Sequence, residues 1–505
     1  MHWANRLSEI SRYPRIARTL WLAAATLVSF LHLFANTLGI AHSDMSLDDA
    51  GTWGVAHRSL TTLVTLPTEF HSQPPLYYYL LHFLLNISSS PWFLRGISWL
   101  FCWLLILFVL FCWDELSLLA RLAFCLIFIF SGITPYLSSC VRPYGMAAFL
   151  TIVSTVMLLR LANEPSKRSG VVYAAWTIAM LYTMAFEVAV LLVHGLVMTG
   201  LMAGTLIRAR NAESFHRVKI WALTMACVCI AYLPYVLLAY HYQYRANATD
   251  TWKAVLSLAT YKRTLRGQLG FSAEISWGLF ILVSMGLVGE FCRRSWLVVV
   301  WPLTVVGSIA FVWYFILGRS ILGAQTKYMM PAFLSVCVLA ALGFDQIRPL
   351  VGRGVWTLFV CSLALLVYVK FPAFDKFMQA GPDIGPFGKL REKLIEYPGK
   401  KIFFPDVGFD AQRPAYVTRN DPDIIYATQS GRGWASAGEA LLSNDYVLAT
   451  IEHYRSEAKC FFYFIWSSKG PYSKVFVPTM ERLGFRRTGP LPATQGHQTV
   501  GYCRN

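Results

Sequence analysis

Two adjacent carboxylates, Asp48 and Asp49, follow the first long apolar run and precede the segment 71–79, His-Ser-Gln-Pro-Pro-Leu-Tyr-Tyr-Tyr. Two carboxylates held close together raise the pKa of one of them, which suits a general base that takes a proton from a hydroxyl. Asp49 has a second interpretation, because Ser46-Leu-Asp-Asp also matches a capping box with Ser46 as the N-cap. That interpretation leaves Asp48 unexplained, so the pattern favours chemistry in this loop.

The segment after the acidic pair begins with His71 and enters a turn at Pro75. Proline is well tolerated in the first turn of a helix, and the tyrosines match an interfacial aromatic belt, so structure alone explains most of the segment. It does not explain His71. Carboxylates and imidazole are acceptable metal ligands, so a divalent cation held by Asp48, Asp49 and His71 stays open, although the chemistry requires no cofactor.

Basic residues near span ends supply the second half of a candidate site. Arg95 and Arg142 lie at the ends of apolar runs, and Lys327 opens the sequence Lys-Tyr-Met-Met-Pro with Arg319 nearby. Such residues often snorkel to the membrane interface, which is the competing interpretation. Guanidinium groups bind phosphate in bidentate fashion, so we expect Arg95 and Arg142 to hold a phosphate, and Lys327 repeats the arrangement later in the chain. Glu187, at the end of an apolar stretch, is a further ionisable group that needs a reason.

The elements that must position these residues are membrane helices. The chain has 505 residues, of which 56% are hydrophobic and 14% charged, and its mean hydropathy is +0.48. These values are typical of a multispanning membrane protein and exclude an ordinary soluble domain. About eleven spans are predicted, near residues 20–40, 93–112, 120–138, 142–160, 171–187, 188–207, 220–240, 276–291, 296–317, 328–344 and 354–370.

The net charge of +17 indicates topology and not a nucleic-acid partner, because the basic residues form short clusters between apolar runs. The segment Pro74–Ile87 is too short for an ordinary span. If it lies at the interface, the basic clusters all fall on the cytoplasmic side. With this membrane topology, the acidic pair, His71 and Arg142 all lie at the outer face. We therefore predict a transmembrane domain over 1–370 with interfacial helices in its first outer loop.

Residues 371–505 are predicted to form a soluble α/β domain on the outer face. Lys401-Ile-Phe-Phe-Pro and the run 460–466, Cys-Phe-Phe-Tyr-Phe-Ile-Trp, are strand-like, with turn-rich sequence between them. Eleven cysteines form no Cys-x-x-Cys pair, and only Cys460 and Cys503 fall in this polar tail. In an oxidising compartment these two would form a disulfide, and two unrelated thiols are an equally good interpretation.

The motifs resemble those of the polytopic C-type-fold glycosyltransferases that use polyprenyl-phosphate sugars, particularly the protein-mannosyltransferase-like and aminoarabinose-transferase-like branch. The resemblance covers roughly residues 20 to 345. Five motifs occur in the family's order, with Asp49 in place of glutamate, Ser72-Gln73 inserted before the prolines and lysine in place of arginine at 327. The matching segments are Asp48-Asp49, His71–Tyr79, Leu94–Ser98, Val141–Tyr144 and Lys327–Pro331.

The resemblance implies a role for each matching residue. Asp48, with Asp49 beside it, is the catalytic base that activates an acceptor hydroxyl in an inverting sugar transfer. The expected donor is a polyprenyl-phosphate-linked sugar, with its phosphate on Arg95, Arg142 and Lys327, and the acceptor is a glycan, lipid or protein. The expected location is the cell inner (plasma) membrane, with the active site periplasmic or extracytoplasmic. The residues of these segments expected to bind substrate are His71, Tyr77, Tyr144 and Tyr328. Glu187 lies outside the matching segments, and we expect it to bind substrate as an ionisable group at the end of an apolar stretch.

Two other classes of protein fit parts of the sequence. A transporter or flippase of lipid-linked sugars would bind cargo without chemistry, but such proteins tend to show paired repeats and interrupted helices at the membrane midplane. The sequence shows neither feature clearly. A non-catalytic scaffold that presents residues 371–505 would leave the acidic pair unexplained. A glycosyltransferase is therefore the preferred hypothesis.

Overall fold

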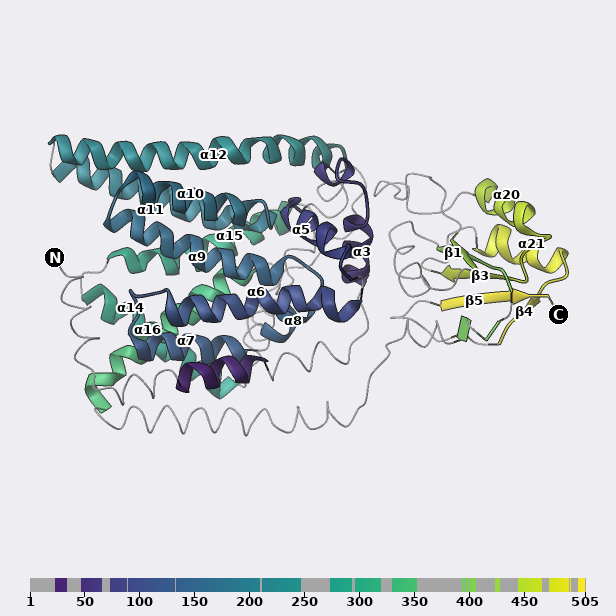
Figure 1. Ribbon diagram of the computed structural model, residues 1–505, viewed down its shortest axis with the longest axis horizontal. Coiled ribbons are helices and arrows are strands. Elements are labelled where there is room, and N and C mark those ends of the chain that lie inside the picture. The colour runs from purple at the N-terminus through teal and green to yellow at the C-terminus, as the bar shows by residue number, and fades with distance from the viewer. Residues whose placement is uncertain are drawn as a thin grey trace.

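The structure is a computed structural model in which a helical bundle is followed by a small α/β unit (Figure 1). The described residues are 23–33, 47–65, 73–88, 90–131, 133–208, 211–246, 273–292, 296–318, 329–351, 393–394, 396–397, 399–405, 423–426, 444–465, 472–489, 491 and 498–504.

The bundle is built from long apolar helices that lie side by side with roughly aligned axes (Figure 1). Its elements after the helical residues 23–33 are α3 (Leu47–Ala56), η1 (Thr62–Val64), α5 (Leu76–Leu85), α6 (Pro91–Phe111), α7 (Leu118–Phe130), α8 (Thr134–Ser139), α9 (Tyr144–Asn163), α10 (Lys167–Leu181), η2 (Ala185–Glu187), α11 (Val188–Arg208), α12 (Ala212–Ala246), α14 (Ala273–Cys292), η3 (Trp296–Val299), α15 (Val300–Gly318) and α16 (Met330–Val351).

Four helices among the described residues are long and apolar enough to cross a bilayer. They are Trp92–Phe111, Tyr144–Asn163, Ala185–Ile207 and Ala212–His241. Shorter apolar helices occur at most of the other predicted spans, including Ala23–Leu33 and Met330–Gln346. The predicted span at 354–370 and the boundary between residues 370 and 371 lie outside the described residues, so the count of eleven stays a prediction.

The predicted span at 120–138 is divided into two helices in the structure. α7 ends at Phe130, and α8 begins at Thr134 with Pro135 in its first turn. Ser131 stabilises the break, because its hydroxyl lies 2.9 Å from Thr134 Oγ1 and donates to the Phe128 carbonyl at 2.9 Å. A proline inside a helix removes a main-chain hydrogen bond and clashes with the preceding turn. The apolar run alone therefore overestimated the length of this helix.

The segment predicted to lie at the interface forms α5, which has ten residues and a length of about 15 Å. That is half of the roughly 30 Å that a spanning helix needs.

Helices α6 and α9 pack closely at Gly145. A Cβ atom at this position would lie 2.6 Å from the Ser98 carbonyl oxygen and 3.1 Å from that of Leu137. Small residues of this kind let membrane helices approach each other.

The α/β unit contains a five-stranded sheet with the strand order β2-β1-β3-β5-β4. β1 is parallel to β2 and β3, whereas β5 is antiparallel to β3 and β4. Its elements are β1 (Lys401–Pro405), β2 (Ile424–Tyr426), α20 (Asn444–Tyr454), β3 (Cys460–Ile465), the π-helical turn η6 (Tyr472–Phe476), α21 (Val477–Arg482), β4 (Arg486–Arg487) and β5 (Gln498–Cys503). The two predicted strand-like runs are thus confirmed as β1 and β3.

Alternate residues of the central strands form the core of this unit. Ile402 and Phe404 of β1 and Phe461 and Tyr463 of β3 are fully buried, and Phe404 stacks on Tyr463 at 6.0 Å. Side chains two residues apart point to the same face of a strand. α20 precedes β3 and contributes the buried Ile451 to the same core. This arrangement agrees with the predicted α/β class of the tail.

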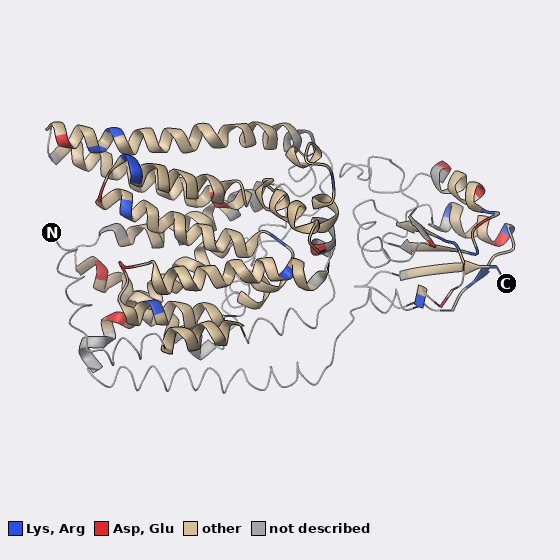
Figure 2. Cartoon of the chain, in the orientation of Figure 1, with Lys and Arg blue, Asp and Glu red and all other residues tan. Residues whose placement is uncertain are grey.

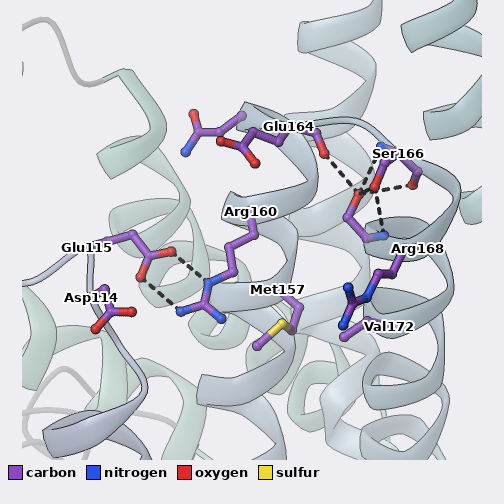
Figure 3. A pocket seen from close by; sticks show the side chains of 10 residues that line it. Asp114, Glu115, Met157, Arg160, Glu164, Ser166, Arg168 and Val172 are labelled. Carbon is purple, nitrogen blue, oxygen red and sulfur yellow. Dashed lines mark hydrogen bonds and ion pairs between the residues drawn. The ribbon is translucent and has the colours of Figure 1, made fainter. Parts of the chain in front are cut away.

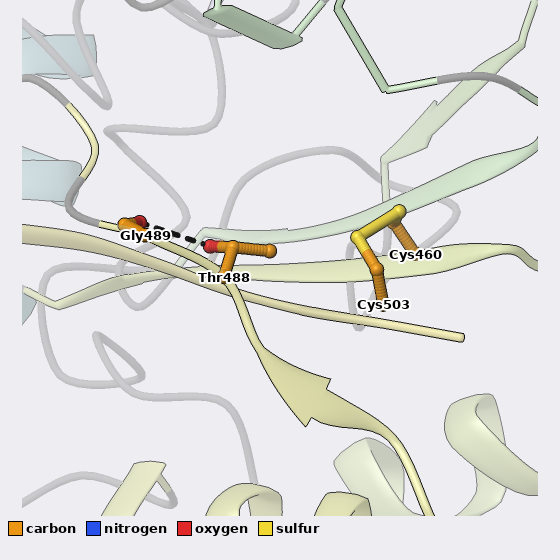
Figure 4. The surroundings of a disulfide bond; sticks show 4 residues. All are labelled: Cys460, Thr488, Gly489 and Cys503. Atoms are coloured by element: carbon orange, nitrogen blue, oxygen red, sulfur yellow. Dashed lines mark hydrogen bonds between the residues drawn. A yellow bond between two sulfur atoms is a disulfide. The ribbon is translucent and has the colours of Figure 1, made fainter. Parts of the chain in front are cut away.

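Cys460 and Cys503 form a disulfide between β3 and β5 (Figure 4). The two residues are directly opposite in the antiparallel register, with their Cα atoms 4.2 Å apart. The sequence left this pair open, and the strand register resolves it. A cross-link of this kind is characteristic of proteins in oxidising compartments.

Candidate functional site

The acidic pair lies on α3, at the end of the bundle that also carries α5 (Figure 1); we call this the α3 end. Asp49 is 2% exposed. Its Oδ1 accepts a hydrogen bond of 2.7 Å from the main-chain N–H of Val141, and its Oδ2 lies 3.8 Å from Nη2 of Arg95 on α6. The second carboxylate of the pair therefore joins three segments that are far apart in the sequence.

Arg142 is held against the same helix one turn further along. Its Nη1 donates a hydrogen bond of 3.0 Å to Oγ1 of Thr52, and its main-chain carbonyl accepts one of 3.2 Å from Ser98. Thr52 follows Asp49 by three residues, so both lie on one face of α3. Asp49 and Thr52 thus bind consecutive residues, Val141 and Arg142, at the turn before α9.

Tyr77 connects α5 to this cluster. It is fully buried, and its hydroxyl lies 3.4 Å from Oγ of Ser98. Burial raises the pKa of the Tyr77 phenol, so the group stays neutral and can donate or accept a hydrogen bond. Ser98 stands at the centre, since it contacts both Tyr77 and the Arg142 carbonyl.

The buried arginines give the α3 end its electrostatic character. Arg95 is 2% exposed and Arg142 is 6% exposed, and both approach polar groups of α3. Burying an ion is costly, and a separation of 3.8 Å recovers less of that cost than a direct charge-assisted hydrogen bond. Figure 2 shows that Lys and Arg in the bundle lie mainly near the ends of the helices, with few along their lengths. The arrangement is suited to an anion with several oxygen atoms.

Several predicted site residues lie either away from this cluster or outside the described part of the chain. Asp48 belongs to α3, but only its backbone is described. His71, Lys327 and Tyr328 lie outside the described residues. Tyr144 is buried in the first turn of α9 and stacks on Tyr136 with ring centroids 5.7 Å apart.

The predicted capping interaction of Asp49 involves Ser46, and Ser46 lies outside the described residues. Of the three predicted metal ligands Asp48, Asp49 and His71, the Asp48 side chain and His71 also lie outside the described part of the chain. Within the described residues, no three His, Cys, Asp or Glu side chains come together as metal ligands.

Three residues of the cluster have roles that the sequence analysis did not assign. Thr52 and Ser98 follow Asp49 and Arg95 by three residues, and this helical spacing was the available signal. Gln73, within the inserted Ser-Gln pair, accepts a hydrogen bond of 3.3 Å from the Ala185 main-chain N–H. The insertion therefore fastens the start of α5 to the turn before α11.

Glu187 lies at the end of this same turn and is completely buried. Its Oε2 is 2.8 Å from Oγ1 of Thr151 on α9. Its Oε1 has no hydrogen-bond partner among the described residues. Tyr77 and Glu187 are both predicted to bind substrate. The hydrogen bond between Ala185 and Gln73 brings the segment before Tyr77 next to the turn that contains Glu187.

A separate pocket of about 470 Å³ lies at the opposite end of the bundle, around the α9–α10 loop (Figure 3). We call this the α9–α10 end. Arg160 donates to Glu115 at 2.8 Å and to the Cys112 carbonyl at 2.5 Å, and Ser166 forms a capping box with Ser169. These groups satisfy one another, so we assign this region a structural role and place the candidate site at the α3 end, where the buried charges are.

Apolar helices of bilayer length followed by an α/β unit define a polytopic membrane protein. The backbone is similar to crystal structures of ArnT from Cupriavidus metallidurans. For the apo form the TM-score is 0.58 at 14% identity, covering 96% of this chain and 97% of that chain. For the form bound to undecaprenyl phosphate it is 0.55 at 13% identity, covering 97% and 98%.

The likeness confirms the predicted C-type glycosyltransferase fold. An oligosaccharyltransferase from Archaeoglobus fulgidus in complex with Zn and sulfate gives a TM-score of 0.49 at 11% identity, covering 87% of this chain and 67% of that chain. No protein-family model and no curated protein matches the chain.

Proposed function

We propose that the protein is a membrane glycosyltransferase that moves a sugar from a polyprenyl-phosphate carrier to an acceptor hydroxyl. The observation that carries the proposal is the buried cluster of Asp49, Arg95 and Arg142 at one end of a bundle with the C-type fold. One solved neighbour, ArnT, is bound to undecaprenyl phosphate, which supports a donor of that class.

In this mechanism, the acceptor hydroxyl attacks the anomeric carbon of the donor while Asp48 takes the hydroxyl proton. A new bond forms between the acceptor oxygen and the anomeric carbon, and the bond from that carbon to the phosphate oxygen breaks. The electron pair leaves on the phosphate, and Arg95, Arg142 and Lys327 stabilise the charge that develops there. Attack from the side opposite the phosphate inverts the anomeric configuration.

Asp49 acts mainly by position in this proposal. Its carboxylate contacts Arg95 and the main chain of Val141, the residue before Arg142, and so positions both proposed phosphate-binding arginines. Tyr77, Tyr144, His71 and Tyr328 are assigned to substrate binding. A divalent cation between Asp48, Asp49 and His71 is not needed for the proton transfer described.

The same proposal sets the location of the site. We place the protein in the inner (plasma) membrane with the α3 end and residues 371–505 on the periplasmic or extracytoplasmic side. Two observations support this orientation. The Cys460–Cys503 disulfide suits an oxidising compartment, and the basic clusters around Arg160 and Arg168 suit the cytoplasmic side.

The test is the substitution Asp48→Asn, which keeps the size of the side chain and removes its basicity. We expect it to abolish sugar transfer from polyprenyl-phosphate donors, as followed by mass spectrometry of surface glycans and lipids in cells with and without the protein. Asp114→Asn, an exposed acid at the α9–α10 end, is the matched control and should transfer normally. Full transfer by a normally folded Asp48→Asn protein would remove Asp48 from the mechanism.

Arg142→Ala separates phosphate binding from snorkelling. The purified variant should bind undecaprenyl phosphate at least about tenfold more weakly, because it loses a charge-assisted contact of typically 1.5–3 kcal/mol. Unchanged binding by the folded variant would favour the snorkelling interpretation.

A further inference from the structure

Two polar clusters lie inside the bundle on one side of α9, one helical turn apart. Thr151 contacts Glu187, and Thr155 contacts His194 on α11. All four side chains are buried, with at most 2% exposure. Buried polar groups in a membrane protein normally find partners or serve a function. The two clusters differ in how completely their hydrogen-bonding groups are used.

The His194 cluster is complete. The Thr155 hydroxyl donates to the Thr151 main-chain carbonyl at 2.8 Å, so its oxygen accepts from Nε2 of His194 at 3.1 Å. The other ring nitrogen, Nδ1, then accepts from the Tyr173 hydroxyl at 3.1 Å. This assignment gives a neutral imidazole with both nitrogens satisfied. His194 therefore joins α9, α10 and α11 and needs no ligand.

The Glu187 cluster is incomplete. Thr151 Oγ1 lies 2.8 Å from Oε2 of Glu187 and also 2.8 Å from the Ala147 carbonyl, although a hydroxyl has only one proton to donate. Oε1 of Glu187 has no partner in the part of the chain that the structure describes, and no described ion pair includes this residue. An acid at zero exposure thus keeps one oxygen atom unused.

The lengths of the helices place this oxygen near the candidate site. α9 has 20 residues and α10 has 15, which correspond to about 30 Å and about 22 Å. The two helices meet at the α9–α10 loop, so α10 ends, and the turn after it begins, about 8 Å short of the opposite end of α9. Glu187 is in that turn, and Thr151 lies seven residues, or about 10 Å, beyond Tyr144.

The start of α5 lies over the same turn. The Leu76 main-chain N–H donates to the Tyr182 carbonyl at 3.0 Å, and Gln73 binds Ala185. Tyr77, the next residue of α5, reaches Ser98 and through it the Arg142 carbonyl. The phosphate-binding groups and Glu187 therefore border the same short segment of α5 from two sides.

Aromatic rings lie beside the turn that carries Glu187. Tyr182, at the start of this turn, packs edge to face on Tyr232 with ring centroids 5.9 Å apart. Aromatic rings beside one or two oriented polar groups are the usual lining of a small-molecule site. Rings pack against the C–H faces of a sugar, and a carboxyl oxygen binds its hydroxyl or amino hydrogens.

Resting on the proposed function, we propose that Glu187 is a specificity-determining residue whose Oε1 accepts a hydrogen bond from the sugar of the donor. The group it binds is a hydrogen-bond donor on the ring, either a hydroxyl or an amine. The phosphate is held by the arginines, and the sugar extends from it toward the turn after α10. The carrier lipid and its phosphate make no contact with Glu187.

The experiment measures KM and kcat for undecaprenyl-phosphate pentoses and hexoses, with and without an amino group, and the affinity for undecaprenyl phosphate itself. We expect Glu187→Leu to raise KM for the preferred donor roughly 10- to 100-fold, the effect of losing a hydrogen bond to a charged or buried partner. Its affinity for undecaprenyl phosphate, which lacks the sugar, should stay within twofold of the wild-type value.

Glu187→Gln distinguishes the two kinds of sugar group. Glutamine keeps an acceptor oxygen without charge, so it should restore KM if the partner is a hydroxyl and fail to restore it if the partner is a charged amine. Thr155→Val, in the complete cluster, is the matched structural control and should lower thermal stability while leaving the donor preference unchanged.

The proposal is overturned if folded Glu187→Leu keeps the wild-type KM and donor preference, or if it weakens undecaprenyl phosphate binding to the same degree as donor binding. The second result is a binding measurement and needs no turnover, whereas the KM comparison needs an active wild-type protein. The proposed function fails by a different outcome, namely a wild-type protein that transfers no sugar from any of these donors.

Discussion

The two ends of the helical bundle each carry an arginine–carboxylate pair, and the pairs differ in geometry and burial. At the α3 end, Arg95 and Asp49 are 2% and 3% exposed, and their nearest charged atoms are 3.8 Å apart. At the α9–α10 end, Arg160 and Glu115 are 35% and 16% exposed and approach to 2.8 Å. The more buried pair therefore has the weaker direct contact.

This difference separates a pair built for stability from one built for function. Partly exposed charges cost little to desolvate, and Arg160 reaches both oxygens of Glu115. Fully buried charges cost much more, and a loose contact does not recover that cost. Asp49 also uses one oxygen for the Val141 main chain. The α3 end thus keeps two guanidinium groups inside the protein, at 2% and 6% exposure, next to polar groups of α3, as the proposed phosphate site requires.

The largest expected effect is in a labelling experiment that shows which side of the membrane each end of the bundle faces. Cys112, at the end of α6, is exposed beside Arg160, and Ser59 is exposed after α3. In a variant that keeps Cys112, carries Ser59→Cys and has its other free cysteines replaced by alanine, an impermeant maleimide added to intact cells should label only position 59. Cys112 should react once the membrane is opened.

The labelling result is all or none. If both positions react from the same side in intact cells, the two ends of the bundle do not face different compartments. The predicted topology, with the α3 end outside and the α9–α10 end inside, would then be wrong.

The next effect is on stability at the α3 end. Arg95→Met removes the buried cation that lies 3.8 Å from the Asp49 carboxylate, and we expect the free energy of unfolding to fall by about 3–5 kcal/mol. Arg95→Met combined with Asp49→Asn should recover most of that loss, because asparagine still accepts the Val141 N–H. Unfolding of the purified protein in detergent gives the free energies. Recovery of stability without recovery of undecaprenyl phosphate binding is the expected signature of a functional pair.

Sequence reasoning identified the residues of this cluster better than their contacts. The motif order placed Asp49, Arg95 and Arg142 at one end of the bundle, and helical spacing makes their positions on each helix predictable. The bond from Asp49 to the Val141 N–H crosses 92 residues to a main-chain group, which carries no sequence signal. The sequence therefore indicates a helix cap or a base for Asp49, and the contact with the Val141 N–H comes from the fold alone.

The same limit explains two other differences. The break between α7 and α8 depends on Ser131 bonding to Phe128 and Thr134 inside a continuous apolar run, where hydropathy alone indicates one helix. The Cys460–Cys503 pair was left open because a disulfide requires the strand register, which the structure supplies. Local patterns predicted the elements, and the long-range partners came only from the fold.

The smallest effect is expected at the α9–α10 end. Glu115→Gln should lower the free energy of unfolding by at most about 1 kcal/mol, because a partly exposed ion pair contributes little and glutamine still accepts from Arg160. Sugar transfer should not change. Glu213→Gln, in the more exposed pair with Arg217, is the reference for a purely superficial contact and should cost about 0.5 kcal/mol or less. A loss of transfer in folded Glu115→Gln would show that short, well-matched pairs also serve the reaction, and burial with a loose contact would then no longer mark the functional end of this bundle.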